Sequence, residues 1–214
     1  RYMNKNNINS SYSAAFTAGA LLYQEMNSVL HLLMQPNGEE LMKDEIKKNE
    51  FLNVASINTR KRYVPELIRR YKAVPVSFWQ DYLSFSEKAQ RVALFYVVMK
   101  TYKLIWDFHI NVTIPKWKSF DPTITKEDLN LRYNEIAGND EFVASWSELT
   151  QNKIISVYLH ILHQAGMRQE GKTDLKQPDL TDEEYLYYLK INEPWFLDAC
   201  LLHAYQVESI KNLL

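Results

Sequence analysis

Cysteine is nearly absent from this 214-residue sequence, because Cys200 is the only one. A single cysteine excludes an intramolecular disulfide and a zinc site built from cysteine ligands. The longest apolar run, residues 92–99, is far shorter than the roughly 20 apolar residues that a membrane span needs. The first residues are polar and rich in asparagine, unlike a signal peptide. We therefore expect a cytoplasmic protein with no membrane contact.

Glycine is also scarce, and the chain has only 5. No glycine-rich loop cradles a phosphate, and the motifs of serine hydrolases, P-loop enzymes, zinc proteases and dinucleotide-binding enzymes are missing. His160 and His163 lie one helical turn apart, but the sequence supplies no third ligand for a metal. We expect a protein that is not an enzyme and that uses no metal, cofactor or small-molecule substrate.

Helical periodicity and helix caps are what the sequence has in abundance. The expected helices span residues 11–34, 39–49, from Ser56 or Asn58 to 73, 75–83, from the capping box at 84–87 to about 111, 125–137, 141–146, from Ser147 or Thr150 to 165, from Thr181 onward, and from Pro194 to 214. Residues 167–177 carry the only good β signal and resemble a small hairpin. The expected fold is all-α, with helix-turn-helix-like units and one small β-hairpin wing.

The expected organisation has three parts. Residues 1–10 read as a flexible tail. A helical region, 11–118, contains one helix-turn-helix-like unit, and a second region, 119–214, contains a winged-helix-like unit. No linker rich in glycine, serine or proline separates the two regions, so we expect them to pack as one compact body.

Charge is unevenly distributed along a chain whose net charge is only −1. The segment Asn58–Lys72 has six cations and one acid, Glu66, whereas residues 121–148 are mostly acidic. Cationic clusters bind phosphates, and arginine can also read guanine edges. The alternative is an ordinary solvated face in which Glu66 pairs with neighbouring arginines. Composition alone leaves both interpretations open.

A second helix start repeats the plan of the basic segment. Ser56 is followed by Thr59 three residues later, as Ser147 is followed by Thr150, and each pair precedes a cation. A helix-turn-helix needs a capped second helix with polar side chains at its start, although such caps also occur by chance. The residues expected to contact nucleic acid are Thr59, Arg60, Lys61, Arg62, Arg69, Arg70, Gln151, Asn152 and Lys153, with Arg168 and Lys172 contacting the backbone from the wing.

Three segments together resemble the BrxA family, the small protein of bacterial BREX phage-defence systems. They are residues 13–22, residues 57–62 with the later Arg69 and Arg70, and residues 149–153 running into 162–167. Their order covers roughly residues 11–180. The resemblance implies a helical, non-enzymatic DNA-binding protein that works beside a methyltransferase, an ATPase and a phosphatase-like component.

The leading hypothesis is therefore double-stranded DNA binding, mainly through phosphates and with a steep salt dependence. One alternative is a protein-interaction adaptor that assembles other defence components, supported by the acidic stretches and the aromatic-rich C-terminal third. Another is RNA binding, since basic helices serve both nucleic acids.

Overall fold

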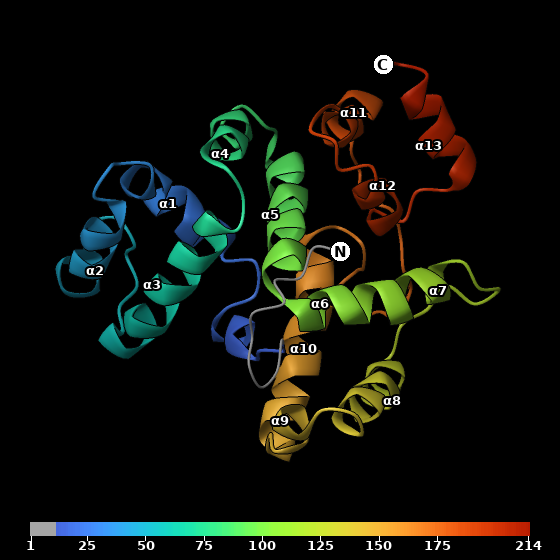
Figure 1. Ribbon diagram of the computed structural model, residues 1–214, viewed down its shortest axis with the longest axis horizontal. Coiled ribbons are helices and arrows are strands. Elements are labelled where there is room, and N and C mark those ends of the chain that lie inside the picture. Colours follow the sequence, from blue (N-terminus) through green and yellow to red (C-terminus); the bar gives the residue numbers. More distant parts are fainter. Residues whose placement is uncertain (1–11) are drawn as a thin grey trace.

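The computed structural model describes residues 12–214, and the tail expected at residues 1–10 lies outside this range. The chain is predominantly helical, as the sequence predicts (Figure 1). Its elements are the 3₁₀ turn η1 (Ala15–Ala18), α1 (Tyr23–Leu33), α2 (Gly38–Lys48), α3 (Ile57–Lys72), α4 (Val76–Tyr82), α5 (Glu87–Thr101), α6 (Lys103–Phe108), the π-helical turn η2 (His109–Thr113), α7 (Ile114–Trp117), α8 (Lys126–Ala137), α9 (Glu141–Ala144), α10 (Glu148–Gln164), α11 (Asp182–Lys190), α12 (Trp195–Ala199) and α13 (Ala204–Lys211).

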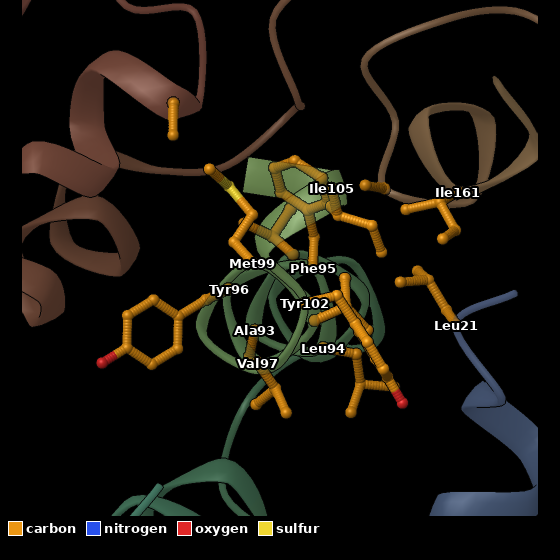
Figure 2. Close-up of a cluster of buried hydrophobic side chains, with 14 of the residues drawn as sticks. Leu21, Ala93, Leu94, Phe95, Tyr96, Val97, Met99, Tyr102, Ile105 and Ile161 are labelled. Atoms are coloured by element: carbon orange, nitrogen blue, oxygen red, sulfur yellow. The ribbon is translucent and has the colours of Figure 1, made fainter. Parts of the chain in front are cut away.

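Helix α5 is the centre of the core. Every residue from 92 to 99 is buried, because α3, α6 and α10 all pack against this helix. Figure 2 looks along α5 and shows apolar side chains on all sides of it, joined by Ile161 of α10 and by Leu21. Buried side chains from both expected regions belong to one hydrophobic cluster. The division at residue 118 stays a sequence-based prediction.

The predicted helix at residues 11–34 is wrong, because the chain leaves helical geometry between η1 and α1. The carbonyl groups of Gly19, Ala20 and Leu21 accept hydrogen bonds from the Arg70 guanidinium at 2.9, 2.6 and 3.1 Å. Leu22 then adopts a left-handed conformation with φ 55°. Carbonyls turned toward Arg70 are not available to a helix, so a contact across about 50 residues overrides the local helical pattern.

Two other predicted helices are each broken. The helix expected to reach residue 111 ends at Thr101, since Tyr102 is extended, and the chain resumes as α6 and then η2. The final helix is divided into α12 and α13 around Leu201, whose φ is 62°. The Tyr102 hydroxyl donates to the Glu66 carboxylate of α3. This contact with a helix distant in sequence accounts for the break at Tyr102.

The predicted β-hairpin wing is also wrong, because residues 12–214 contain no strand. Arg168 and Leu175 form only an isolated antiparallel bridge. Beyond it, the backbone pairs elsewhere: the Ile124 N–H donates to the Thr173 carbonyl at 2.8 Å, and the Leu175 N–H donates to the Pro122 carbonyl at 2.9 Å. A β-ladder needs repeated backbone hydrogen bonds between the same two segments. Here residues 122–124 form backbone hydrogen bonds with one arm of the expected hairpin instead.

Four predicted helix caps are confirmed at the residue level. The capping box expected at residues 84–87 is wrong, because α5 begins at Glu87 and its cap is Ser86, which accepts the Ala89 N–H at 3.2 Å. Ser56, rather than Asn58, caps α3, and Ser147, rather than Thr150, caps α10. Complete capping boxes open α8 at Thr125 and α11 at Thr181. Caps depend on residues within three or four positions, which is why the sequence alone identifies them.

Candidate nucleic-acid interface

The start of α3 presents two exposed cations, Lys61 and Arg62. Among residues 12–214, neither forms an ion pair. The Ser56 hydroxyl accepts a hydrogen bond from the N–H of Thr59, a half-buried residue, at 3.3 Å, which holds the helix start in place. The first turn of α3 contains no acidic residue, unlike those of α2, α5, α8 and α10. The positive end of the helix dipole therefore adds to the two cations.

Arg60 has a structural position, although the sequence places it beside Lys61 and Arg62. Its exposed fraction is 8%, and its guanidinium donates to the backbone carbonyls of Ile46, Val54 and Ala55. These carbonyls belong to the end of α2 and to the connection that follows it. Arg60 therefore fastens that connection to α3, and its guanidinium is engaged with carbonyls inside the fold.

Arg70 is wholly buried, and its neighbour Arg69 is paired. The Arg70 guanidinium lies 3.5 Å from Glu66 in addition to bonding the carbonyls described above, and Arg69 pairs with Glu66 at 2.6 Å. The only other cation at this end of the helix, Lys72, pairs with Glu39 of α2. The basic segment is thus divided: Lys61 and Arg62 face solvent and have no ion pair among the described residues, whereas its other four cations have partners within the fold.

The start of α10 has the same local construction as the start of α3. The Thr150 N–H donates to the Ser147 hydroxyl at 3.2 Å. Asn152 and Lys153 are exposed, whereas the Gln151 side chain donates to Asn130 of α8 at 3.0 Å. Asn130 is a neighbour that sequence reasoning missed, since it lies 21 residues away and no spacing rule connects the two.

Arg168 and Lys172 lie in very different surroundings. Arg168 is half-buried, its guanidinium donates to the Leu159 carbonyl at 3.4 Å, and burial lowers its pKa. Lys172 is exposed and has no ion pair within the described part of the chain. With the hairpin absent, these two residues do not form a wing.

A short segment ties the two helices together. Arg70 of α3 holds the carbonyls of Gly19, Ala20 and Leu21, and the Leu21 N–H donates to Gln164 of α10 at 2.9 Å. Figure 1 shows α3 and α10 beginning on the same lower side of the view and running upward from there. The two capped helix starts are therefore turned toward one side of the molecule, with their far ends fastened to a common segment.

Two histidines, His109 and His163, are engaged within the fold. His109 is completely buried, with Nδ1 3.0 Å from the Tyr158 hydroxyl and Nε2 2.7 Å from the Ala199 carbonyl, and burial lowers its pKa to about 4. The His163 Nδ1 lies 3.2 Å from the Arg168 carbonyl. Within residues 12–214, no three histidine, cysteine or acidic side chains gather as a metal site would require.

Comparison with known proteins gives the family. The BrxA family model matches residues 10–192, most of the chain. The chain belongs to the BrxA family. It is 23% identical over 189 residues to the BREX protein BrxA of Bacillus cereus strain H3081.97, covering 87% of this chain and 94% of that protein. It is 24% identical over 148 residues to the BREX protein BrxA of Escherichia coli O9:H4 strain HS, covering 69% and 70% respectively.

The fold also has a solved counterpart. An uncharacterized protein from Magnetospirillum magneticum has a crystal structure that superposes with a TM-score of 0.76 at 21% sequence identity, covering 89% of this chain and 98% of that one. At this identity the similarity establishes the shared fold alone. Among the helices of residues 12–214, none combines the length and apolar character that crossing a membrane requires.

Proposed function

We propose that this BrxA-family chain is a non-enzymatic, DNA-binding component of a BREX phage-defence system. Its curated relatives carry the name BREX protein BrxA, which supports the setting. The observation that carries the DNA-binding part is the start of α3, where Lys61 and Arg62 are exposed and unpaired beside a helix end that has no acidic residue. Such a surface attracts a polyanion although the whole chain is close to neutral.

The contacts to duplex DNA come mainly from phosphates. Lys61 and Arg62 bind the backbone from α3, and Asn152 and Lys153 add hydrogen bonds from α10. Thr59 lies at the start of α3, where a backbone contact is also within reach. Arg60 and Arg70, which the sequence places in the contact set, are assigned to the fold because their guanidinium groups already satisfy internal carbonyls.

A helix-turn-helix-like arrangement accompanies this proposal. Helix α2 packs against α3 and would lie across the DNA backbone while α3 enters the groove. The connection between them, residues 49–56, is longer than a standard turn, and the Glu45 carboxylate organises it by accepting the N–H groups of Glu50, Phe51 and Leu52. This proposal includes a cytoplasmic setting, where the DNA is.

A second candidate is an adaptor that assembles other BREX proteins, such as the methyltransferase, the ATPase or the phosphatase-like component. The observation in its favour is a group of exposed apolar side chains within and beside the acidic stretch, Leu131, Phe142 and Leu149. Exposed apolar residues gathered on neighbouring elements mark protein interfaces more often than nucleic-acid interfaces. The two candidates differ in whether binding needs Lys61 and Arg62.

Fluorescence anisotropy with a labelled DNA duplex separates these candidates. We expect the Lys61→Ala/Arg62→Ala variant to bind about tenfold more weakly, because two phosphate contacts are lost. A matched control, Lys88→Ala/Lys190→Ala, removes the same charge from two exposed sites and should retain wild-type affinity. Unchanged binding by the first variant would disprove the assigned interface.

A competition experiment tests the RNA-binding and adaptor alternatives. Unlabelled duplex DNA should displace the labelled duplex better than structured RNA of equal length does. Stronger competition by RNA would favour the RNA-binding alternative instead. Capture of purified BREX proteins by a chain that binds no duplex at all would favour the adaptor.

A further inference from the structure

The loop between α7 and α8 presents a fully exposed aromatic side chain. Phe120 has an exposed fraction of 105%, and Figure 1 shows the loop after α7 extending away from the helices. The loop is ordered by its own hydrogen bonds, since the Ser119 hydroxyl lies 2.7 Å from the Lys116 carbonyl and 2.8 Å from the Asp121 carbonyl. A large apolar ring held in water by an ordered loop is unfavourable unless a ligand covers it.

A stack of three rings begins just before this loop. The ring of Trp117 lies against His203 with centroids 5.2 Å apart and planes 23° apart, and His203 lies against Tyr205 at 5.8 Å and 14°. Tyr205 is 73% exposed and contacts no further ring within residues 12–214. The stack therefore ends on an open, flat aromatic face that can accept one more planar ring.

The stack is held in position from two sides. The His203 N–H donates to the Gln206 side chain at 2.8 Å, and the Gln177 side-chain amide donates to the same Gln206 oxygen at 2.6 Å. Gln177 also donates to the Leu201 carbonyl at 2.9 Å. These bonds fix the start of α13 against the segment that precedes α11, so the aromatic face is preorganised for binding.

Mixed charges lie on the side of the molecule that carries the Phe120 loop. The backbone bonds from residues 122 and 124 to residues 175 and 173 bring Lys172 and Lys176 to the side of the Phe120 loop, where Lys118 also lies. All three lysines are exposed and have no ion pair among the described residues. Asp121 and Asp174 are exposed here too, so the net charge is low. Such a surface favours a ligand that gains affinity from its rings and only part of it from phosphates.

We propose that Phe120 and the Trp117–His203–Tyr205 stack form a platform for unpaired nucleobases of a single-stranded nucleic acid. Bases stack on aromatic side chains whatever their sequence, and lysines follow the backbone between them. This site is separate from the proposed duplex interface on α3 and α10. Two of its rings, His203 and Tyr205, lie beyond the family match at residues 10–192, whereas Trp117 and Phe120 lie within it.

The test uses the full-length chain and a labelled oligothymidylate of about 12 nucleotides, with an oligouridylate of equal length as the RNA arm. We expect Tyr205→Ala and Phe120→Ala each to weaken binding about tenfold. Tyr205→Phe keeps the ring and should bind like the wild type. Leu83→Ala, which removes another exposed apolar side chain, is the matched control. Stronger binding of the oligothymidylate assigns the bases to DNA, and stronger binding of the oligouridylate assigns them to RNA.

An abasic oligomer of the same length separates stacking from charge attraction. If bases stack on the platform, the abasic oligomer should bind at least about tenfold more weakly than the oligothymidylate. Equal binding of the two oligomers, or unchanged affinity in both alanine variants, would overturn the proposal. Anionic phospholipid vesicles that bind the wild type but not Phe120→Ala, with oligothymidylate binding unaffected, would make this a membrane surface instead. Lys61→Ala/Arg62→Ala should retain oligothymidylate binding, so a failure of the duplex proposal remains distinguishable.

Discussion

Arg70 joins the residue 19–21 segment to α3 through three backbone carbonyl groups. Its guanidinium bonds Gly19, Ala20 and Leu21 and lies beside Glu66, and its exposed fraction is 0%. A buried network of this kind is stabilising only while every member is present. Removing the arginine leaves a buried carboxylate and several carbonyls short of donors.

Arg70→Met should therefore lower the free energy of unfolding by about 3–5 kcal/mol, the usual loss when one partner of a buried ion pair is removed. Urea unfolding followed by circular dichroism measures it. Arg69→Met is the matched control: this neighbour shares Glu66 but is half exposed, so its loss should stay below about 1 kcal/mol. Equal losses in the two variants would show that Arg70 has no special structural role.

His109 gives the stability a pH dependence. The Ala199 carbonyl can only accept, so Nε2 carries the proton and Nδ1 accepts from Tyr158. The pKa in the folded chain, about 4, is below the ordinary 6.5. As pH falls below 6.5 the unfolded chain takes up the proton first. The free energy of unfolding that the neutral histidine contributes above pH 6.5 is therefore lost progressively as the pH falls to about 4.

The expected loss is on the order of 3 kcal/mol for this single group, and His109→Gln should lose the corresponding part of the pH slope. Urea unfolding at several pH values between 4 and 6.5 compares the two proteins. Identical slopes in the wild type and the variant would contradict the buried, neutral state of this histidine.

Residue type and spacing identified the cations of the basic segment but could not sort them. Lys61 and Arg62 are exposed, whereas Arg60 bonds a carbonyl 14 residues away and Arg70 one that is 50 residues away. From the sequence of the helix alone, these four cations cannot be divided into exposed and buried ones. That division depends on which other elements pack against α3. The exposed half of the candidate site was therefore predictable, and its buried half was not.

At the scale of elements, the capped starts of α3 and α10 were predictable, whereas helix interruptions were not. The caps at Ser56 and Ser147 act within three residues, so local sequence is enough. The interruptions at Leu22 and Tyr102 occur where Arg70 and Glu66 of α3 form hydrogen bonds with distant backbone or side chains. The hairpin failed for a related reason, because residues 122–124 pair with one of its two arms.

The end of α8 allows a stabilising substitution. Gly138 ends the helix with φ −65° and ψ −18°, a conformation that any residue adopts, and an added Cβ would meet only ordinary contacts beginning at 3.4 Å. Gly138→Ala should raise the free energy of unfolding by about 0.5 kcal/mol, because it restricts the unfolded chain. Thermal unfolding measures this change.

Gly38 at the start of α2 provides the contrast. A Cβ there would lie 2.5 Å from the Leu33 carbonyl oxygen, so Gly38→Ala should be clearly destabilising. If Gly138→Ala destabilised the protein as much as Gly38→Ala does, the described geometry of the α8 end would be incorrect.

The proposed interface depends on an arrangement of the whole molecule. Helix α5 forms the centre, and α3 and α10 pack against it. The residue 19–21 segment bonds Arg70 of one helix and Gln164 of the other, and both capped starts face the same side in Figure 1. The proposed duplex interface uses both helix starts on this one side. It requires only a local positive surface, so the net charge of −1 does not contradict it.

The salt dependence of duplex binding tests this account most directly. Affinity should fall steeply between low and physiological salt, and each phosphate contact contributes about 0.9 to the slope of log affinity against log salt concentration. Lys61→Ala/Arg62→Ala should reduce that slope by about 2 relative to the wild type, while Lys88→Ala/Lys190→Ala leaves it unchanged. An identical slope in the wild type and the Lys61→Ala/Arg62→Ala variant would mean that the start of α3 does not contact the DNA.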